Sequence, residues 1–335
     1  MNSHSGKRMY QRLLRVLAVF AVSLAVVLGM LLCVKPTEAL GGIKALLLDG
    51  FLSEAGFSRT MLFWPLLMLT GLSVGCAWKA GFLHLGAPGQ FTLGAFAAMS
   101  GGLLLKLPWW ACLMLAAFGG MLGGAILGLI KHRSRMIEVL SAVMLNYTAL
   151  CLTQWLWEDG LSAVAENASL NPSAVPVFML GNQFAVSLGL PIALLLCLVL
   201  WIVLRFTVIG FEVQAGSANQ EAARRAGMPV ERNRKRLLVL SGAFSGLAGG
   251  VCLLSGMTDT ALSVISVQMG YAGLTVALLS FAHPIGIIVA ALVAAGILAG
   301  GETLPATIPQ EIGMMLLALA LLGSAIMLGK KQKEK

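Results

Sequence analysis

The chain has 335 residues, of which 58% are hydrophobic and 11% are charged. A soluble domain carries about a quarter charged residues, so this composition excludes an ordinary water-soluble fold. The formal net charge of +9 would suit a nucleic-acid-binding protein, but the basic residues lie in short stretches between long apolar blocks. The sequence also lacks the alternating segments of about 10 residues that are typical of a membrane β-barrel. These features indicate a helical membrane protein.

Ten apolar segments follow one another along the chain, each close to the roughly 20 residues that cross a bilayer as a helix. The first is too long for the apolar core of a signal peptide, so we expect it to be a membrane span. The third and eighth contain Gly-rich stretches, which leaves open whether the helices near 81–106 and 262–286 are continuous or broken. The ten segments are 13–34, 60–79, 86–106, 109–130, 136–157, 185–206, 237–256, 262–282, 285–301 and 308–328.

The basic residues divide unevenly between the two sides of such a bundle. With a cytoplasmic N-terminus, the inner segments hold 19 Lys and Arg residues and the outer segments hold 4. The positive-inside rule expects this asymmetry. We therefore predict an all-α, polytopic bundle of about ten transmembrane segments in the inner (plasma) membrane, with both termini cytoplasmic. The whole chain, 1–335, is expected to form a single transmembrane domain.

Small residues recur at four-residue intervals in several of these segments. Small side chains let helix backbones approach closely in lipid, so the pattern predicts a compact bundle. The clearest series are Gly120, Gly124 and Gly128, and Gly242, Gly246 and Gly250.

Sequence patterns for catalysis are missing from the chain. There is no G-x-x-x-x-G-K-[ST] phosphate loop and no H-E-x-x-H, and the G-x-S-x-G match from Gly71 to Gly75 lies inside the apolar segment 60–79, not at a strand-to-helix turn. The six cysteines show no C-x-x-C spacing. We therefore expect no enzyme active site, no ATPase site, no metal site and no cofactor.

The largest inner loop, 207–236, contains the signals of a short helix. Asn219 can cap it, Glu221 lies in its first turn, residues 220–226 are good helix formers, and Gly227 is a natural stop. A helix this short is unstable alone in water because its nucleation is costly. We therefore expect it to pack either on its own bundle or in a groove of a partner protein.

Glu221, Ala222 and Ala223, followed after three residues by Gly227, resemble the E-A-A-x-x-x-G coupling motif of ABC-transporter permeases. Three further stretches resemble the branch of that family that carries simple sugars and nucleosides and is related to branched-chain amino-acid permeases. They are Gly81 to Phe96, which is similar to G-x-x-N-x-G-x-x-G-Q-x-x-x-G-A-F; Ile137 to Tyr147, similar to N-E-V-I-x-T-I-M-L-N-Y; and Thr275 to Gly286, similar to A-V-A-L-L-G-x-x-x-P-x-G. The chain departs from these patterns at several positions, including His84, where Asn is common.

The resemblance implies a permease subunit that has no ATPase site of its own. Its partners would be cytoplasmic ABC ATPase subunits, a second permease subunit in a homo- or heterodimer, and an extracytoplasmic solute-binding protein. The 207–236 loop would be the coupling loop that contacts the ATPase. The solute would be small and polar, most simply a nucleoside or a simple sugar, with an amino acid as the alternative.

Three hydrogen-bonding side chains lie deep in apolar segments and are our candidates for the substrate pathway, namely Gln90, Asn146 and Tyr147. An unpaired amide in lipid costs several kcal/mol, so each must meet another helix, water or solute. A hydrogen bond between helices is therefore the competing interpretation of these residues.

Two other classes of protein remain open at this point. An ion-coupled secondary carrier would need paired acids within its spans and usually shows broken helices, and the Gly-rich segments keep this alternative open. An intramembrane enzyme or assembly factor would need a facing reactive pair, for which the sequence offers no candidate.

Overall fold

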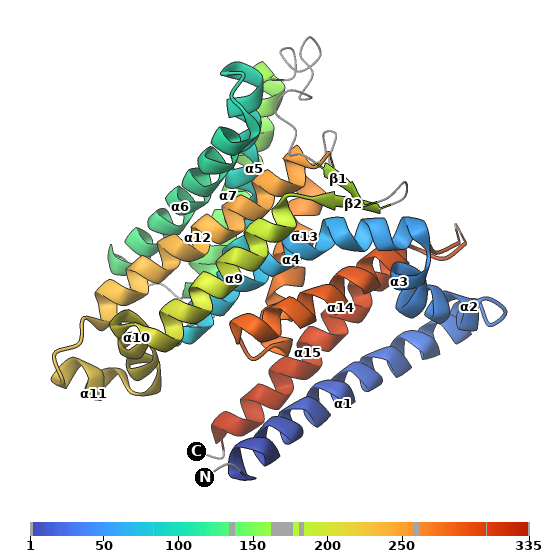
Figure 1. The fold of residues 1–335 in the computed structure, drawn as a ribbon, viewed down its shortest axis with the longest axis horizontal. Helices are drawn as coiled ribbons and strands as arrows, with labels where there is room; N and C mark the ends of the chain where they lie inside the picture. Colours follow the sequence, from blue (N-terminus) through green and yellow to red (C-terminus); the bar gives the residue numbers. More distant parts are fainter. Residues whose placement is uncertain are drawn as a thin grey trace. The chain divides into compact units, whose positions relative to one another are not determined.

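The computed structural model describes residues 3–82, 84–133, 138–161, 177–180, 184–256, 262–305 and 307–333. Within these residues, an α-helix of 18 residues or more lies at each of the ten predicted spans (Figure 1). Six of them, α4, α6, α7, α9, α12 and α14, are long and apolar enough to cross a membrane. The ten helices are α1 (Ser3–Val34), α4 (Glu54–Lys79), α5 (Ala87–Leu104), α6 (Trp109–Arg133), α7 (Glu138–Leu156), α9 (Gly189–Phe206), α12 (Val230–Leu254), α13 (Leu262–Leu279), α14 (Pro284–Glu302) and α15 (Ile312–Lys333).

The two Gly-rich segments each contain one continuous helix next to a non-helical turn. The described residues between Ala80 and Gly86 are not helical, and α5 begins at Ala87 with Pro88 in its first turn, where proline is tolerated. At the other segment α13 ends at Leu279, and α14 begins at Pro284. The helices themselves are therefore unbroken, and the interruptions lie at their ends.

A short β-hairpin precedes α9 and was not predicted from the sequence. Strand β1 (Val177–Leu180) pairs antiparallel with β2 (Phe184–Ser187), with Val177 opposite Ser187. The sixth predicted span began at 185, so its first residues were wrongly assigned to the helix. Ser187 ends the strand, and its Oγ accepts a hydrogen bond from Gly189 N at 3.2 Å, which favours a helix start at Gly189.

The chain divides into two compact units, residues 1–60 with 293–335, and residues 61–292. In the first unit α1 packs against α15. Three short helical turns follow α1, namely α2 (Ala39–Lys44), η1 (Ala45–Asp49) and α3 (Gly50–Leu52). Thr60 Oγ1 donates to Gly50 O at 2.6 Å, and Arg59 Nε lies 3.3 Å from Glu302 Oε2. The first contact ties the short helices to α4, and the second joins α4 to the end of α14.

The second unit is built around α12, which packs along α6 and α5 (Figure 1). The two predicted glycine series face each other at this contact. A Cβ on Gly120 would lie 2.1 Å from Gly242 O, and a Cβ on Gly242 would lie 2.2 Å from Gly120 O. Only glycine allows such an approach, so the compact packing that the sequence predicted is confirmed here.

We predict that Gly120→Ala lowers the melting temperature of the purified protein, because the added methyl group must push two helix backbones apart. Overpacking of this kind costs about 1–3 kcal/mol. Gly128→Ala is the matched control on the same helix, since its Cβ would lie 3.9 Å from Leu238 Cδ1. Equal melting temperatures for the two variants would contradict this account of the α6–α12 contact.

Candidate functional site

The 207–236 segment begins where α9 ends. Thr207 is extended, with φ −109° and ψ 158°, and its Oγ1 accepts a hydrogen bond from Gly210 N at 3.3 Å. This cap starts α10 (Val208–Ala218), which folds back on the end of α9. Gln214 Nε2 donates to Leu204 O at 2.7 Å and satisfies a carbonyl of the last helical turn of α9.

The predicted short helix is present as α11 (Gln220–Arg225). Asn219 Oδ1 accepts from Ala222 N at 3.1 Å, which confirms the predicted cap. Gly227 has φ +77° and ends the helix, with its N–H bonded to Arg224 O and the Met228 N–H bonded to Ala223 O, both at 3.0 Å. These two bonds make a Schellman motif, so the predicted stop is also confirmed.

The helix α11 turns one small residue inward and leaves the rest of its surface exposed. Ala223 is buried, with 4% of its surface exposed. Glu221, Ala222, Arg224 and Arg225 are all exposed. Both predicted kinds of contact are therefore open to α11, because it rests on its own bundle through Ala223 and offers a free outer face.

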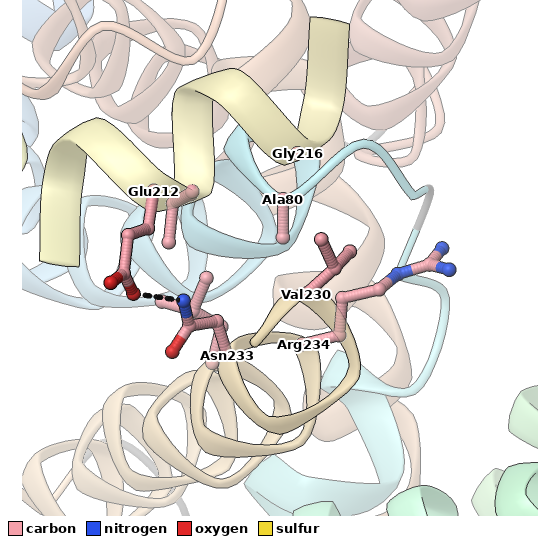
Figure 2. A pocket seen from close by; sticks show the side chains of 8 residues that line it. Ala80, Glu212, Gly216, Val230, Asn233 and Arg234 are labelled. Atoms are coloured by element: carbon pink, nitrogen blue, oxygen red, sulfur yellow. Dashed lines mark hydrogen bonds between the residues drawn. The ribbon is translucent and has the colours of Figure 1, made fainter. Parts of the chain in front are cut away.

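The base of the segment is held by contacts among α10, α12 and the connection between α4 and α5. Glu212 Oε2 accepts from Asn233 Nδ2 at 2.6 Å, joining α10 to α12 across a small pocket (Figure 2). The Arg234 guanidinium lies 5.2 Å from the ring centroid of Phe82. These contacts join α10 to α12, and α12 to the residues before α5.

A second polar cluster lies at the start of α5. Asn146 of α7 is 6% exposed, and its Oδ1 accepts from Gly89 N at 2.9 Å while its Nδ2 donates to Leu85 O at 2.8 Å. From α12, Ser245 Oγ donates to Ala87 O at 2.6 Å. Asn146 thus uses its amide oxygen to hold the first turn of α5 and its amide nitrogen to hold the non-helical stretch before it, as expected for the helix-to-helix role that competed with solute contact.

Gln90 and His84 complete this cluster. His84 Nε2 and Gln90 Oε1 lie 2.9 Å apart in a hydrogen bond, and Gln90 is fully buried. The Nε2 atom of Gln90 has no hydrogen-bond partner among the described residues. A buried amide without a partner costs about 1–3 kcal/mol, which marks this position as one that another conformation or a bound molecule can satisfy.

The structure brings Gln90 and Asn146 together but separates Tyr147 from them. Tyr147 is 65% exposed, on the outer surface of α7. Sequence reasoning missed Ser245 and the Glu212–Asn233 pair, and it gave His84 no place in a site. Within the described ranges, no group of three His, Cys, Asp or Glu side chains could hold a metal ion.

Comparison with known proteins identifies the family of the chain. The family model described as "Branched-chain amino acid transport system / permease component" matches residues 56–325. The chain belongs to this permease family. The match includes α10, α11 and the Gln90 cluster, so both sites lie in the part of the chain that the family shares. The resemblance inferred from the E-A-A-x-x-x-G motif is confirmed.

Curated relatives of the permease are also ABC transporter subunits. A guanosine ABC transporter permease protein of Bacillus subtilis is 30% identical over 76% of this chain and 76% of its own. A nucleoside ABC transporter permease protein of Lactococcus lactis is 28% identical over 80% of each chain. A glucose ABC transporter permease protein of Haloferax volcanii is 27% identical over 92% of this chain and 85% of its own.

We predict that Asn146→Leu destabilises the purified permease, because it leaves Gly89 N–H and Leu85 C=O buried without partners. Each lost partner costs about 1–3 kcal/mol. Tyr147→Leu, a change at the exposed neighbour, should leave the melting temperature unchanged. Should both variants melt like the wild type, Asn146 does not clamp α5.

Proposed function

We propose that the chain is the transmembrane permease subunit of an ATP-binding-cassette importer that moves a nucleoside across the inner membrane. The family membership supports the permease role, and the guanosine and nucleoside permeases among its relatives support the solute class. The observation that carries the coupling role is α11, a capped helix whose outer face is covered by none of the described residues. Simple sugars are the next solute class, in line with the glucose permease relative.

The proposal includes ten membrane spans, formed by α1, α4 to α7, α9 and α12 to α15, with both termini in the cytoplasm. The helix present at each apolar segment supports it, as does the excess of Lys and Arg in the segments assigned to the inside. In this topology α10 and α11 lie in the cytoplasm and the β-hairpin lies outside.

The proposed partners are two cytoplasmic ATPase subunits, a second permease subunit and an extracytoplasmic solute-binding protein. The ATPase would bind the exposed face of α11, which includes Glu221, Ala222 and Arg225. Because α11 contacts α12, and α12 packs along α5 and α6, a push on α11 moves a helix that is part of the core. ATP binding can shift the access equilibrium only through such a differential contact.

The exposed face of α7 is our proposed wall of the solute pathway. Among the six candidate spans, α7 has the lowest mean hydropathy, 1.3, and the smallest buried share, 22%. By contrast α9 is 28% buried but has a mean hydropathy of 2.4, which suits lipid. The α7 face carries Tyr147 and Trp155, 65% and 58% exposed. A second permease subunit and an aqueous path between the two would suit these side chains better than lipid does.

In this proposal Tyr147 stacks on the solute, and Asn146 acts indirectly by holding the start of α5. Gln90 keeps one buried amide donor that has no partner among the described residues, which supports a contact with solute when the α5 start opens.

Coupling is tested by Glu221→Lys in the permease reconstituted with its ATPase and binding protein. We expect normal membrane insertion and ATP hydrolysis, but uptake reduced by at least about tenfold, since a repulsive contact of 1.4 kcal/mol already gives that factor. The control is Glu54→Lys, the same change at an exposed residue in the first turn of α4, which should retain uptake. Normal uptake by Glu221→Lys would refute the coupling role of α11.

The solute class is tested by uptake of radiolabelled guanosine in competition with other nucleosides, glucose and leucine. We expect nucleosides to compete and leucine not to, whereas competition by leucine alone would favour amino-acid import.

Tyr147→Ala should weaken nucleoside uptake by roughly 10-fold, because base stacking on an aromatic ring contributes about 1–3 kcal/mol. Tyr147→Phe keeps the ring and should retain uptake. Full activity of the alanine variant would remove Tyr147 from the pathway.

A further inference from the structure

Four exposed apolar side chains lie at the junction between α9 and α10. They form what we call the junction patch, Phe206, Val208, Ile209 and Phe211, with 67%, 73%, 47% and 64% of their surfaces exposed. The opposite face of α10 is occupied, because Gly210, Val213 and Gly216 are buried against the bundle. The first turns of α10 thus have one free face, and that face is apolar.

The patch continues the exposed surface of α9. That surface consists of Leu195, Leu198, Val199 and Ile202, which are 42–60% exposed. Since α9 has the highest mean hydropathy of the six candidate spans, 2.4, this surface suits lipid acyl chains. The junction patch adjoins its end in sequence, with no charged residue other than Arg205 between them.

Arg205 adds a cation at this boundary. Its guanidinium lies 5.9 Å from the ring centroids of both Trp201 and Phe206, and these two rings contact each other edge to face at 5.6 Å. An exposed arginine beside aromatic rings at the end of an apolar helix is the arrangement found at membrane–water interfaces. There the rings lie at headgroup depth and the guanidinium meets lipid phosphate.

The chemistry of the patch differs from that of α11. The exposed residues of α11 are mainly charged, including Glu221, Arg224 and Arg225, as suits a contact with a soluble protein. The junction patch has no charged member, and the rest of α10 separates it from α11. The two surfaces therefore fit different partners.

We infer that the junction patch is a membrane-interface anchor, which seats the start of α10 among the phospholipid headgroups with Arg205 facing their phosphates. Apolar burial at this depth and the attraction of a cation to a phospholipid surface both favour the docking. The anchor would hold the segment that carries α11 at a fixed depth, so that force on α11 moves α12 instead of bending α10. This inference requires α9 to span the membrane but does not depend on the solute or on the ATPase contact.

The test measures the depth of a fluorescent label on the patch. The permease is reconstituted in nanodiscs of equal parts phosphatidylcholine and phosphatidylglycerol, with the exposed Cys33 and Cys151 changed to Ser. A label is attached through Phe211→Cys or, as an independent site, Val208→Cys. Ser217→Cys, also exposed on α10, is the matched control.

We expect lipids with a nitroxide on the headgroup to quench the patch labels several-fold more than the control label, with or without the ATPase. Aqueous iodide should show the reverse order. Two results would overturn the inference: equal quenching of patch and control labels by the lipid nitroxide, or protection of the patch labels from iodide only when the ATPase is added. The second result would assign the patch to the ATPase.

Discussion

Backbone contact between α6 and α12 is the constraint on which the larger unit of the structure depends. Gly120 and Gly242 approach so closely that neither can carry a side chain. This contact fixes α12 in the core between α6 and α5, and α12 begins only a few residues after α11 ends. A rigid, glycine-packed helix is therefore joined directly to the most exposed helix of the 207–236 segment. Close packing transmits a displacement because such an interface cannot deform gradually.

The second requirement is that α11, a helix of only six residues, remains folded at the protein surface. Such a helix cannot nucleate on its own, and α11 is held by its termini and by a single buried alanine. Asn219 satisfies an N–H at one end, and Gly227 allows the chain to turn at the other. The Glu212–Asn233 bond and the Arg234–Phe82 contact fix the base. Two exposed ion pairs, Arg224 with Glu231 of α12 and Glu221 with Arg225, add little to its stability, which leaves the outer face available to a partner.

Local signals predicted much of this correctly. Apolar segment length located the ten helices, the four-residue spacing of small residues predicted a compact bundle without identifying which helices meet, and Asn219 and Gly227 predicted the ends of α11. In each case the signal lies in residues that are close together in the sequence.

The features that were missed depend on tertiary contacts. The clamp joins Asn146 to Gly89 across 57 residues, and the Glu212–Asn233 bond joins two helices whose approach no local pattern encodes. Adjacent residues in a helix also point in different directions, which is why Asn146 is buried and Tyr147 exposed.

The central claim is that an ATPase docks on the outer face of α11. It is tested most directly by placing a photo-cross-linking amino acid at Ala222 and irradiating the permease assembled with its neighbouring gene products. The account predicts a cross-link from Ala222 to a subunit that carries a phosphate-binding loop, and none from the same group at Leu105, which is exposed at the end of α5. The absence of such a cross-link, or labelling of Ala222→Cys by an impermeant maleimide added outside intact cells, would contradict it.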